Sequence, residues 1–184
     1  MRILAISGSL REGSHNTALL RAAAGLVPDD VSLELFEGLA TLPPYNGDHD
    51  HDQPPPAVAA LREAIAAADA ILVATPEYNG SVPGVLKNAV DWASRPHRES
   101  ALWGKTAAVV GASTGAYGAL WAQADLRKAL GTAGARVLDR DLPVGRAADA
   151  FDIAGNLTDQ ALADRLSAHL GALLELAQPA EIAA

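Results

Sequence analysis

The alternation of short apolar runs with segments of helical spacing constrains the fold of this chain most strongly. Three runs, at residues 3–6, 70–74 and 106–110, each end in a cluster of Ser, Thr, Pro, Asn or Gly. A continuous apolar run of this length is typical of a strand buried on both faces of a parallel sheet. Weaker strand patterns occupy residues 31–36 and 136–138. Segments with helical spacing span residues 17–26, 57–68, 85–93, 119–130 and 157–176.

The order of these elements predicts an α/β fold of three layers. Parallel neighbours need a crossover, usually a helix, so alternating strands and helices give a parallel sheet with helices on both faces. Five strands and five helices fit a single domain over residues 1–184, because two independent cores in a chain of this length would each be small. We expect residues 178–184 to form a frayed tail.

The composition excludes several classes of protein. Hydrophobic residues make up 49% of the chain and charged residues 20%, which rules out global disorder. The net charge of −8 argues against a general affinity for nucleic acid or anionic membranes. Because there is no cysteine, thiolate catalysis, iron–sulfur clusters and cysteine zinc sites are excluded. We find no signal segment and no apolar stretch of membrane-spanning length, so we expect a cytoplasmic protein.

Residues 42–56 form a long connection that contains five of the eleven prolines. Asp and His alternate within it from Asp48 to Asp52, a pattern that raises the question of a metal site. Side chains of an extended segment point alternately to opposite sides, and no further ligand is tied to these residues by spacing. We therefore predict an irregular surface loop and assign no metal site.

The segment after the first strand, residues 7–17, is suited to an anion. It brings glycines, hydroxyls, an amide and Arg11 to the N-terminus of a helix, where free backbone N–H groups favour negative charge. Gly8 and Gly13 have the spacing of a triphosphate-binding loop, but Ser14-His15 stands where that motif requires Lys followed by Ser or Thr. The G-x-G-x-x-G dinucleotide motif is also absent. A single terminal phosphate fits, held by Arg11 with Ser9, Ser14, Asn16 and Thr17; simple capping of the helix is the alternative.

The segment after the second run, residues 75–84, predicts a stiff turn at the same edge of the sheet. Pro76, Gly80 and Pro83 restrict its backbone, and such a wall can hold the plane and bond the edge of a flat heteroaromatic ring. Glu77 is a possible general acid or base, but a loop glutamate is more often merely solvated. We assign no catalytic side chain.

The segment after the third run contains G-x-S-x-G at residues 111–115, the pattern of a serine hydrolase nucleophile elbow. A hydrolase with Ser113 as nucleophile needs a later histidine, and His169 flanks the apolar stripe of the last helix instead of standing on a loop. That interpretation also leaves the phosphate-like loop unexplained. We favour residues 113–118 as a third wall of a ligand site, with a structural turn as the alternative.

Three motifs together carry a resemblance to a known family. They are GSLR at residues 8–11 with Ser14, Asn16 and Thr17, TPEYNGSVPGVLKNAVDW at residues 75–92, and GASTG at residues 111–115. From residue 2 to about residue 130 the chain resembles the NAD(P)H-dependent FMN reductases, a family that also includes quinone and chromate reductases.

The resemblance implies a flavodoxin-like fold with strand order 2-1-3-4-5, bound FMN, NADPH or NADH as co-substrate, and a homodimer or homotetramer with the flavin near a subunit boundary. By motif position, the phosphate would be held by Ser9, Arg11, Ser14, His15, Asn16 and Thr17. The isoalloxazine would be lined by Pro76, Glu77, Tyr78 and Asn79, and closed on its other side by Ser113, Thr114 and Gly115.

The residues and the resemblance agree on a mechanism in which the flavin performs the chemistry and the protein supplies orientation and one open ring face. Hydride from the nicotinamide would reach flavin N5, and a small acceptor such as a quinone, free flavin, azo compound or chromate would then enter the same space. This order predicts ping-pong kinetics. The alternative is a flavodoxin-like electron carrier, for which the acidic balance would suit docking to a basic redox partner.

The helix predicted at residues 85–93 has more apolar surface than one face against a sheet requires. Trp92 falls outside the stripe formed by residues 86, 89, 90 and 93. We therefore expect Trp92 to anchor a two-fold dimer interface, the alternative being that it folds back onto its own subunit.

Overall fold

The computed structural model describes residues 1–152 and 155–178 and contains the parallel sheet that the sequence predicts. Its strands lie in the order β2-β1-β3-β4-β5, all parallel, and a further short strand, β6, pairs with the end of β4. Their bounds are Arg2–Ser7 for β1, Ser32–Leu35 for β2, Ala70–Thr75 for β3, Thr106–Ala112 for β4, Arg136–Val137 for β5 and Pro143–Val144 for β6. The predicted fold class and strand order are confirmed, whereas β6 is an addition to the prediction.

The five predicted helices are present, with two revised starting points. Their bounds are His15–Ala24 for α1, Pro56–Ala67 for α2, Gly84–Ala93 for α3, Leu120–Thr132 for α4 and Gln160–Ala177 for α5, and single 3-10 turns occupy Gly38–Thr41 and Gly47–His49. α1 starts before residue 17 because the Ser14 hydroxyl caps it, accepting from the Thr17 N–H at 3.2 Å. α5 starts after residue 157 because Asp159 is its cap. The predicted tail lies outside the described residues from residue 179 onward.

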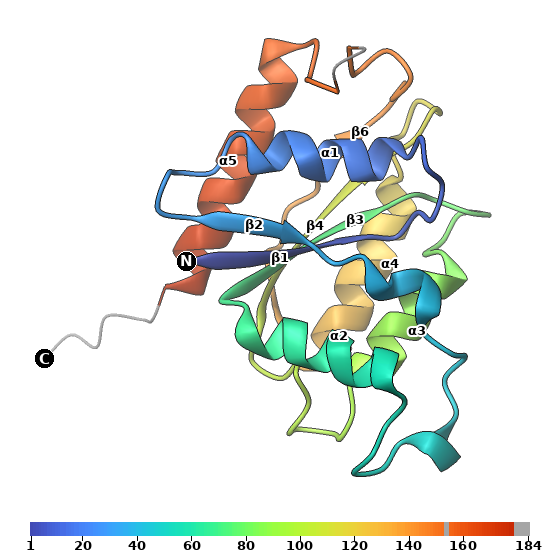
Figure 1. Cartoon of the computed structure of the whole chain (residues 1–184). Helices are drawn as coiled ribbons and strands as arrows, with labels where there is room; N and C mark the ends of the chain where they lie inside the picture. Colours follow the sequence, from blue (N-terminus) through green and yellow to red (C-terminus); the bar gives the residue numbers. More distant parts are fainter. Residues whose placement is uncertain (153–154, 179–184) are drawn as a thin grey trace, which may run out of the picture.

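Helices cover the sheet on both faces, as Figure 1 shows. α1 and α5 pack on one face, where Leu19, Leu20 and Leu166 join the apolar residues of β1, β3 and β4 in one core cluster. α2, α3 and α4 pack on the other face around a second cluster. Because both faces are buried, the three central strands can be apolar throughout. None of the described helices combines the length and apolarity that a membrane span requires.

β6 extends the sheet beyond the edge that the sequence predicts. The chain after β5 returns beside β4, so that Gly111 N–H donates to Leu142 O at 3.2 Å and Ser113 N–H to Val144 O at 3.0 Å. The buried Gln123 side chain of α4 holds this return: its amide group donates to Gly118 O, and its oxygen accepts from Leu142 N–H, both at 3.0 Å. A two-residue strand that begins with a proline has no periodicity that could predict it.

The connection at residues 42–56 is largely irregular, as predicted, but it is firmly attached to the helices below. Asp50 forms an ion pair of 2.7 Å with Arg62 of α2, and the Arg62 guanidinium also donates to Trp92 O. Within the described part of the chain, no three acidic or histidine side chains gather in a way that could hold a metal ion. The alternating Asp and His run therefore contributes an ion pair to the fold.

The prediction that Trp92 anchors a dimer interface is wrong. Trp92 is 0% exposed in its own subunit. Its indole N–H donates to Pro43 O at 2.8 Å, and its ring packs edge-on against Tyr45 at 4.8 Å between ring centroids. The residue lies outside the sheet-facing stripe of α3, and the loop from residue 42 covers it. Helical spacing correctly placed Trp92 on a face of α3 that does not face the sheet. It could not indicate that the loop packs on this face.

The turn before α4 allows a test of the β6 packing. Gly118 has φ +58°, and a Cβ on it would lie 2.5 Å from Val144 N, so Gly118→Ala should destabilise the fold by about 3 kcal/mol. Gly131→Ala is the matched control, because nothing lies within 4 Å of its added methyl and alanine is the better helix former. Thermal unfolding should show a clear loss for the first variant and none for the second; equal melting temperatures would contradict this packing.

Candidate active site

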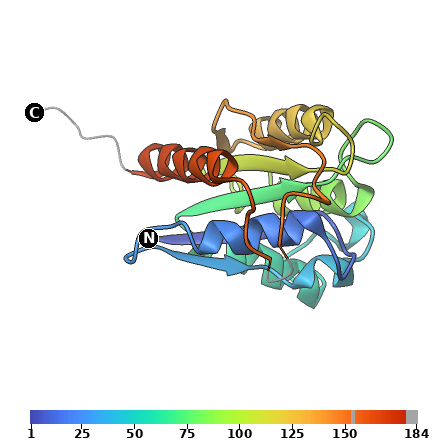
Figure 2. The same cartoon turned by 90° about the horizontal axis from the view of Figure 1, so that it is seen from above.

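The three motif segments meet at one edge of the sheet, because β1, β3 and β4 are adjacent and parallel. Figure 2 shows the strand arrows pointing to the edge from which the loops leading to α1, α3 and α4 emerge. The first two segments are in direct contact: Gly8 N–H donates to Ala74 O at 2.8 Å. A Cβ at Gly8 would lie 2.7 Å from the side chain of Leu86, so glycine allows this approach without displacing Leu86.

A cavity of about 320 Å³ lies where these segments meet. Its lining comes from all three: Ser9, Arg11, Ser14, His15, Asn16, Pro76, Glu77, Tyr78, Ala112, Ser113 and Thr114. Only Ala112 was not among the residues that the sequence assigned to the cofactor. Of the assigned residues, Thr17, Asn79 and Gly115 do not line the cavity. The structure therefore brings most of the assigned residues, from three separate segments, together around one cavity.

One end of the cavity is formed by the start of α1. Ser14 is buried and caps this helix, and His15 is its first residue. The free N–H groups of the first turn favour an anion here. Arg11 is exposed and forms no ion pair with any other residue that the structure describes, so its positive charge is available at this end.

Asn16 and Thr17 have partners within the protein. The Asn16 side chain donates to Ala112 O at 3.0 Å and accepts from Ala112 N–H at 2.9 Å, which ties α1 to the end of β4. The Thr17 hydroxyl bonds the Ser7 hydroxyl at 2.8 Å. Both residues therefore fix the position of the walls, a function that their motif positions did not indicate.

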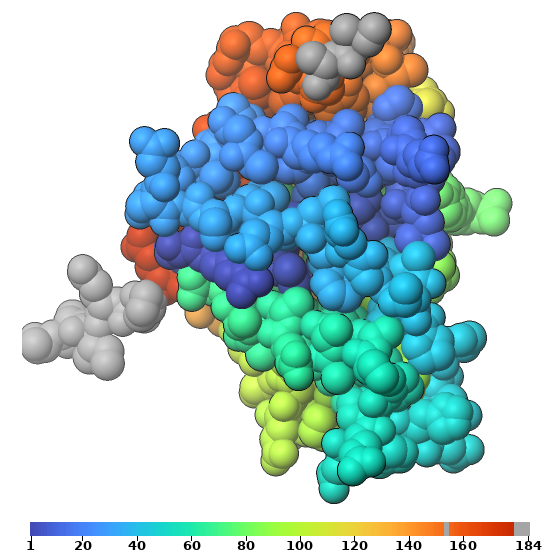
Figure 3. All heavy atoms as spheres, in the orientation of Figure 1, coloured from blue at the N-terminus to red at the C-terminus, as the bar shows by residue number. Residues whose placement is uncertain are grey.

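The second wall ends in a tight hairpin. Asn79 and Gly80 have φ of 54° and 75°, and Tyr78 pairs with Ser81 across them, the arrangement of a two-residue turn that requires left-handed backbone at both central positions. In the space-filling view this turn, coloured green near residue 80, projects beyond the neighbouring surface (Figure 3). Asn79 thus shapes the turn that presents Tyr78, while its own side chain is away from the cavity lining.

Glu77 joins the second wall to the third. Its carboxylate accepts from Trp121 N–H at 3.1 Å and from Ala122 N–H at 3.2 Å, in the first turn of α4. A carboxylate at this position satisfies free backbone donors and complements the helix dipole. Glu77 therefore has a structural function, in contrast to the solvated glutamate expected of an exposed loop.

Within the described residues, the Ser113 hydroxyl forms no hydrogen bond to a base that could activate it as a nucleophile. Its hydroxyl accepts from Gly115 N–H at 3.2 Å. His169, the candidate base, is 0% exposed within the α5 layer of the core, and burial, together with the nearby Arg140, lowers its pKa to about 4. The arrangement disfavours serine hydrolysis and leaves Ser113 as part of a wall.

Two aromatic contacts near the cavity have no signal in the sequence motifs. The His15 ring stacks on Phe151, with ring centroids 6.2 Å apart and an interplanar angle of 9°. Beside the third wall, Tyr117 and Trp121 meet edge to face at 4.9 Å, and they are 65% and 50% exposed. Phe151 lies far along the chain from His15, so only the fold could reveal the first contact.

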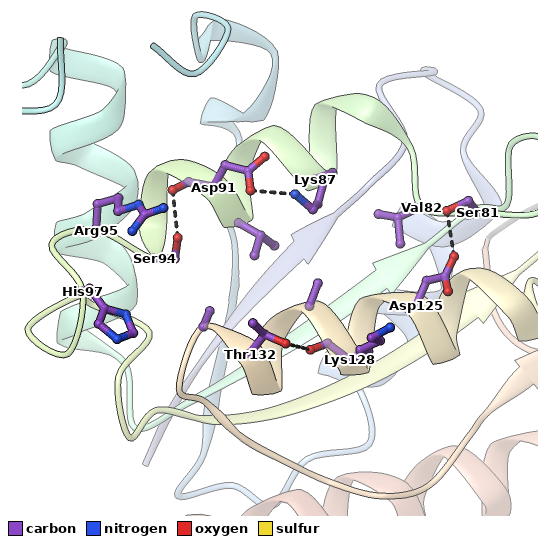
Figure 4. Close-up of a pocket in the computed structure, with 13 residues that line it drawn as sticks. Ser81, Val82, Lys87, Asp91, Ser94, Arg95, His97, Asp125, Lys128 and Thr132 are labelled. Atoms are coloured by element: carbon purple, nitrogen blue, oxygen red, sulfur yellow. Dashed lines mark hydrogen bonds and ion pairs between the residues drawn. The ribbon is translucent and has the colours of Figure 1, made fainter. Parts of the chain in front are cut away.

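A larger groove of about 550 Å³ runs between α3 and α4 (Figure 4). It shares no lining residue with the motif cavity, although the second motif, residues 75–92, contributes part of its lining. Figure 4 shows side chains of both charges along its walls: Lys87 and Asp91 on α3, Asp125 and Lys128 on α4, and Arg95 and His97 at one end. Lys87 pairs with Asp91 at 2.6 Å, and Asp125 accepts from the Ser81 hydroxyl at 2.7 Å. The groove has a greater volume than the motif cavity. Its walls carry charged side chains, however, and such walls do not suit a flat apolar ring.

The motif cavity has the groups that FMN requires. Helix N–H groups, hydroxyls and Arg11 at one end match a terminal phosphate. Pro76 and Tyr78 line the same cavity and supply apolar surface for a ring. The single cavity thus fits a molecule that is anionic at one end and aromatic at the other.

Comparisons with known proteins agree with this site. The model of a family described as NADPH-dependent FMN reductase matches residues 1–149. An NAD(P)H-dependent FMN reductase of Pseudomonas aeruginosa is 47% identical over 174 residues, covering 94% of this chain and 93% of that protein. A 2-hydroxy-1,4-benzoquinone reductase of a Burkholderia species is 48% identical over 127 residues, 69% of this chain and 68% of that one.

A solved structure shares both fold and sequence. It is FerB, a flavoenzyme NAD(P)H:(acceptor) oxidoreductase from Paracoccus denitrificans, with a TM-score of 0.84, 35% identity and coverage of 96% of both chains. The family match, these relatives and the three motif segments around one cavity lead to the same assignment. The chain belongs to the NADPH-dependent FMN reductase family, whose FMN and reduced nicotinamide are the cofactor and co-substrate expected from the sequence.

Proposed function

We propose that this protein is an FMN-dependent NAD(P)H oxidoreductase that reduces small acceptors, with quinones as the principal class. The observation that carries the proposal is the single cavity in which an anion-binding helix start and a flat wall lie together. The named activity of the Burkholderia relative supports a quinone as acceptor. Free flavin, azo compounds and chromate are further acceptors that an open site would admit.

The residues of this chain bind and orient the cofactor in the proposed mechanism. Arg11, Ser9 and the helix start hold the phosphate, and Pro76, Tyr78 and Ser113 hold the ring between the second and third walls. Bound FMN supplies the hydride chemistry between nicotinamide and acceptor. Because Glu77 already accepts two backbone hydrogen bonds, no side chain is assigned as proton donor.

The two substrates use the same open side in turn, which gives ping-pong kinetics. Tyr78 borders this side and is 53% exposed, so the cavity has no lid within the described residues that would have to move before a second molecule enters. An electron carrier with the same fold would need a protein partner instead.

We also place the protein in the cytoplasm, as the sequence predicts.

The first test is the absorbance spectrum of the purified protein followed by steady-state kinetics. We expect bound flavin, released by denaturation as FMN, and continuous NADPH oxidation with a benzoquinone and no partner protein. Double-reciprocal plots at several quinone concentrations should be parallel. Flavin that is reduced once but not turned over would favour an electron carrier, and a colourless protein that does not take up FMN would overturn the proposal.

The second test concerns the phosphate end of the cavity. Arg11→Ala removes its free positive charge, and we expect FMN affinity to fall roughly tenfold to a hundredfold, since a charge-assisted contact contributes about 1.5 to 3 kcal/mol. Arg21→Ala, in the last turn of the same helix, is the matched control. Fluorescence titration of the apoprotein with FMN measures both, and a loss below about threefold for Arg11→Ala would exclude Arg11 as the phosphate partner.

We further propose that two copies of the chain associate over the surface of α3 and α4. Tyr117 and Trp121 are exposed aromatic residues beside the cavity, and exposed aromatic clusters of this kind are typical of interfaces. The groove between the two helices has charges of both signs, so a two-fold axis can bring Lys128, which forms no ion pair with a described residue, to an acidic group of the other copy. The flavin site would then lie near the subunit boundary.

Substitution of exposed tryptophans distinguishes this surface from others. Trp121→Glu places a charge in the proposed interface and should reduce the particle mass to that of one chain, with weaker flavin retention. Trp103→Glu is the control, because Trp103 is also exposed, at 46%, but precedes β4 at the opposite edge of the sheet. Light scattering measures the mass, and a wild type of single-chain mass, or an unchanged mass in Trp121→Glu, would contradict the proposal.

A further inference from the structure

His15 is a titratable group at the anion end of the cavity. It is the first residue of α1, lines the same cavity as Arg11 and is only partly exposed. Its ring is held parallel to Phe151 at 6.2 Å between centroids, which restricts the orientation of the imidazole. A partly buried imidazole next to a guanidinium, at a helix start that favours anions, is positioned for a phosphate.

Without an anion, the surroundings of His15 favour its neutral form. Partial burial, and then the positive charge of Arg11, lower its pKa below the ordinary value of 6.5. At neutral pH the site therefore holds the Arg11 charge and a neutral imidazole. A dianion beside both groups favours the protonated form of His15 instead, because its attraction for the imidazolium opposes the repulsion from Arg11.

We propose that His15 is a phosphate ligand that gains a proton when a phosphate dianion binds, so that loading of FMN takes up a proton from solution. This inference rests on the proposed function of the cavity. The imidazolium donates a hydrogen bond to a phosphate oxygen and adds a second positive charge to that of Arg11. Because the proton comes from the solvent, the site holds its cofactor more tightly as the pH falls through the range in which His15 titrates.

The other charged groups near His15 do not oppose its protonation when a phosphate binds. On the first segment, Arg11 and Glu12 are both exposed. Asp149 and Asp152 lie within two residues of Phe151 in sequence, and the Asp152 carboxylate accepts from the backbone and side chain of Asn156. The third wall contributes Ser113 and Thr114, which are uncharged. Arg11 is the charge that acts on the free imidazole, and the phosphate supplies the opposite one.

Calorimetry measures the proton directly. Apoprotein is titrated with FMN at about pH 7.5, where the phosphate is already a dianion, in HEPES and in Tris, whose ionisation enthalpies differ. The dependence of the binding enthalpy on the buffer gives the number of protons exchanged. We expect wild type to take up about half a proton or more, and His15→Asn to take up almost none. Riboflavin, which has the same ring but no phosphate, should bind to wild type without this uptake.

A permanently charged variant keeps the test decisive if His15→Asn binds poorly. His15→Arg should bind FMN without proton uptake and with an affinity that changes little between about pH 6.5 and 8.5, whereas the affinity of wild type should fall about tenfold or more over this range. FMN binding with equal proton uptake in wild type and both variants would overturn the inference while leaving the proposed function intact. Loss of FMN binding in both folded variants would also contradict it. A wild type that binds no FMN would refute the proposed function itself.

Discussion

The parallel pairing of β1, β3 and β4 is the constraint on which the rest of the structure depends. Parallel strands end at a common edge, so the three segments that follow them must leave the sheet side by side. Their separation is then set by the strand spacing, and glycine is needed at Gly8, where one segment crosses the end of the next strand. The cavity is a consequence of this crowding, since its walls cannot move apart without breaking the central sheet.

Side-chain hydrogen bonds to the backbone fix the loops that the sheet alone cannot hold. Asn16 joins α1 to β4, Glu77 joins the second wall to α4, and Gln123 joins α4 to the return segment at β6. Each satisfies backbone groups that would otherwise be unpaired, and the bonds of Asn16 and Gln123 are buried. A site that binds a rigid ring needs walls of fixed spacing, and these three residues maintain it while the rim stays open. Polar residues at the strand ends thus serve the fold and the site together.

The sequence predicted what depends on local pattern and missed what depends on contacts between distant segments. The continuous apolar character of residues 70–74 identifies a buried strand, and the parallel topology then places the motif segments together. Trp92 shows the opposite case: its helical position was correct, but the irregular loop that covers it through Pro43 has no periodicity to reveal where it packs. Likewise, the amide of Asn16 was identified as polar and close to the site, yet its partner Ala112 is 96 residues away.

Local electrostatics, and not net charge, decide what this site can hold. A chain of net charge −8 repels anions on average, so a phosphate has to be attracted by groups within a few ångströms of it. The start of α1 supplies partial positive charge from backbone N–H groups, and Arg11 supplies a full charge without a competing carboxylate partner among the described residues. In the proposed function the phosphate of FMN would lie at this basic end, whereas nicotinamide and acceptor would enter at the open side that Tyr78 borders. Selective retention of the flavin is therefore compatible with exchange of the other ligands at the open side.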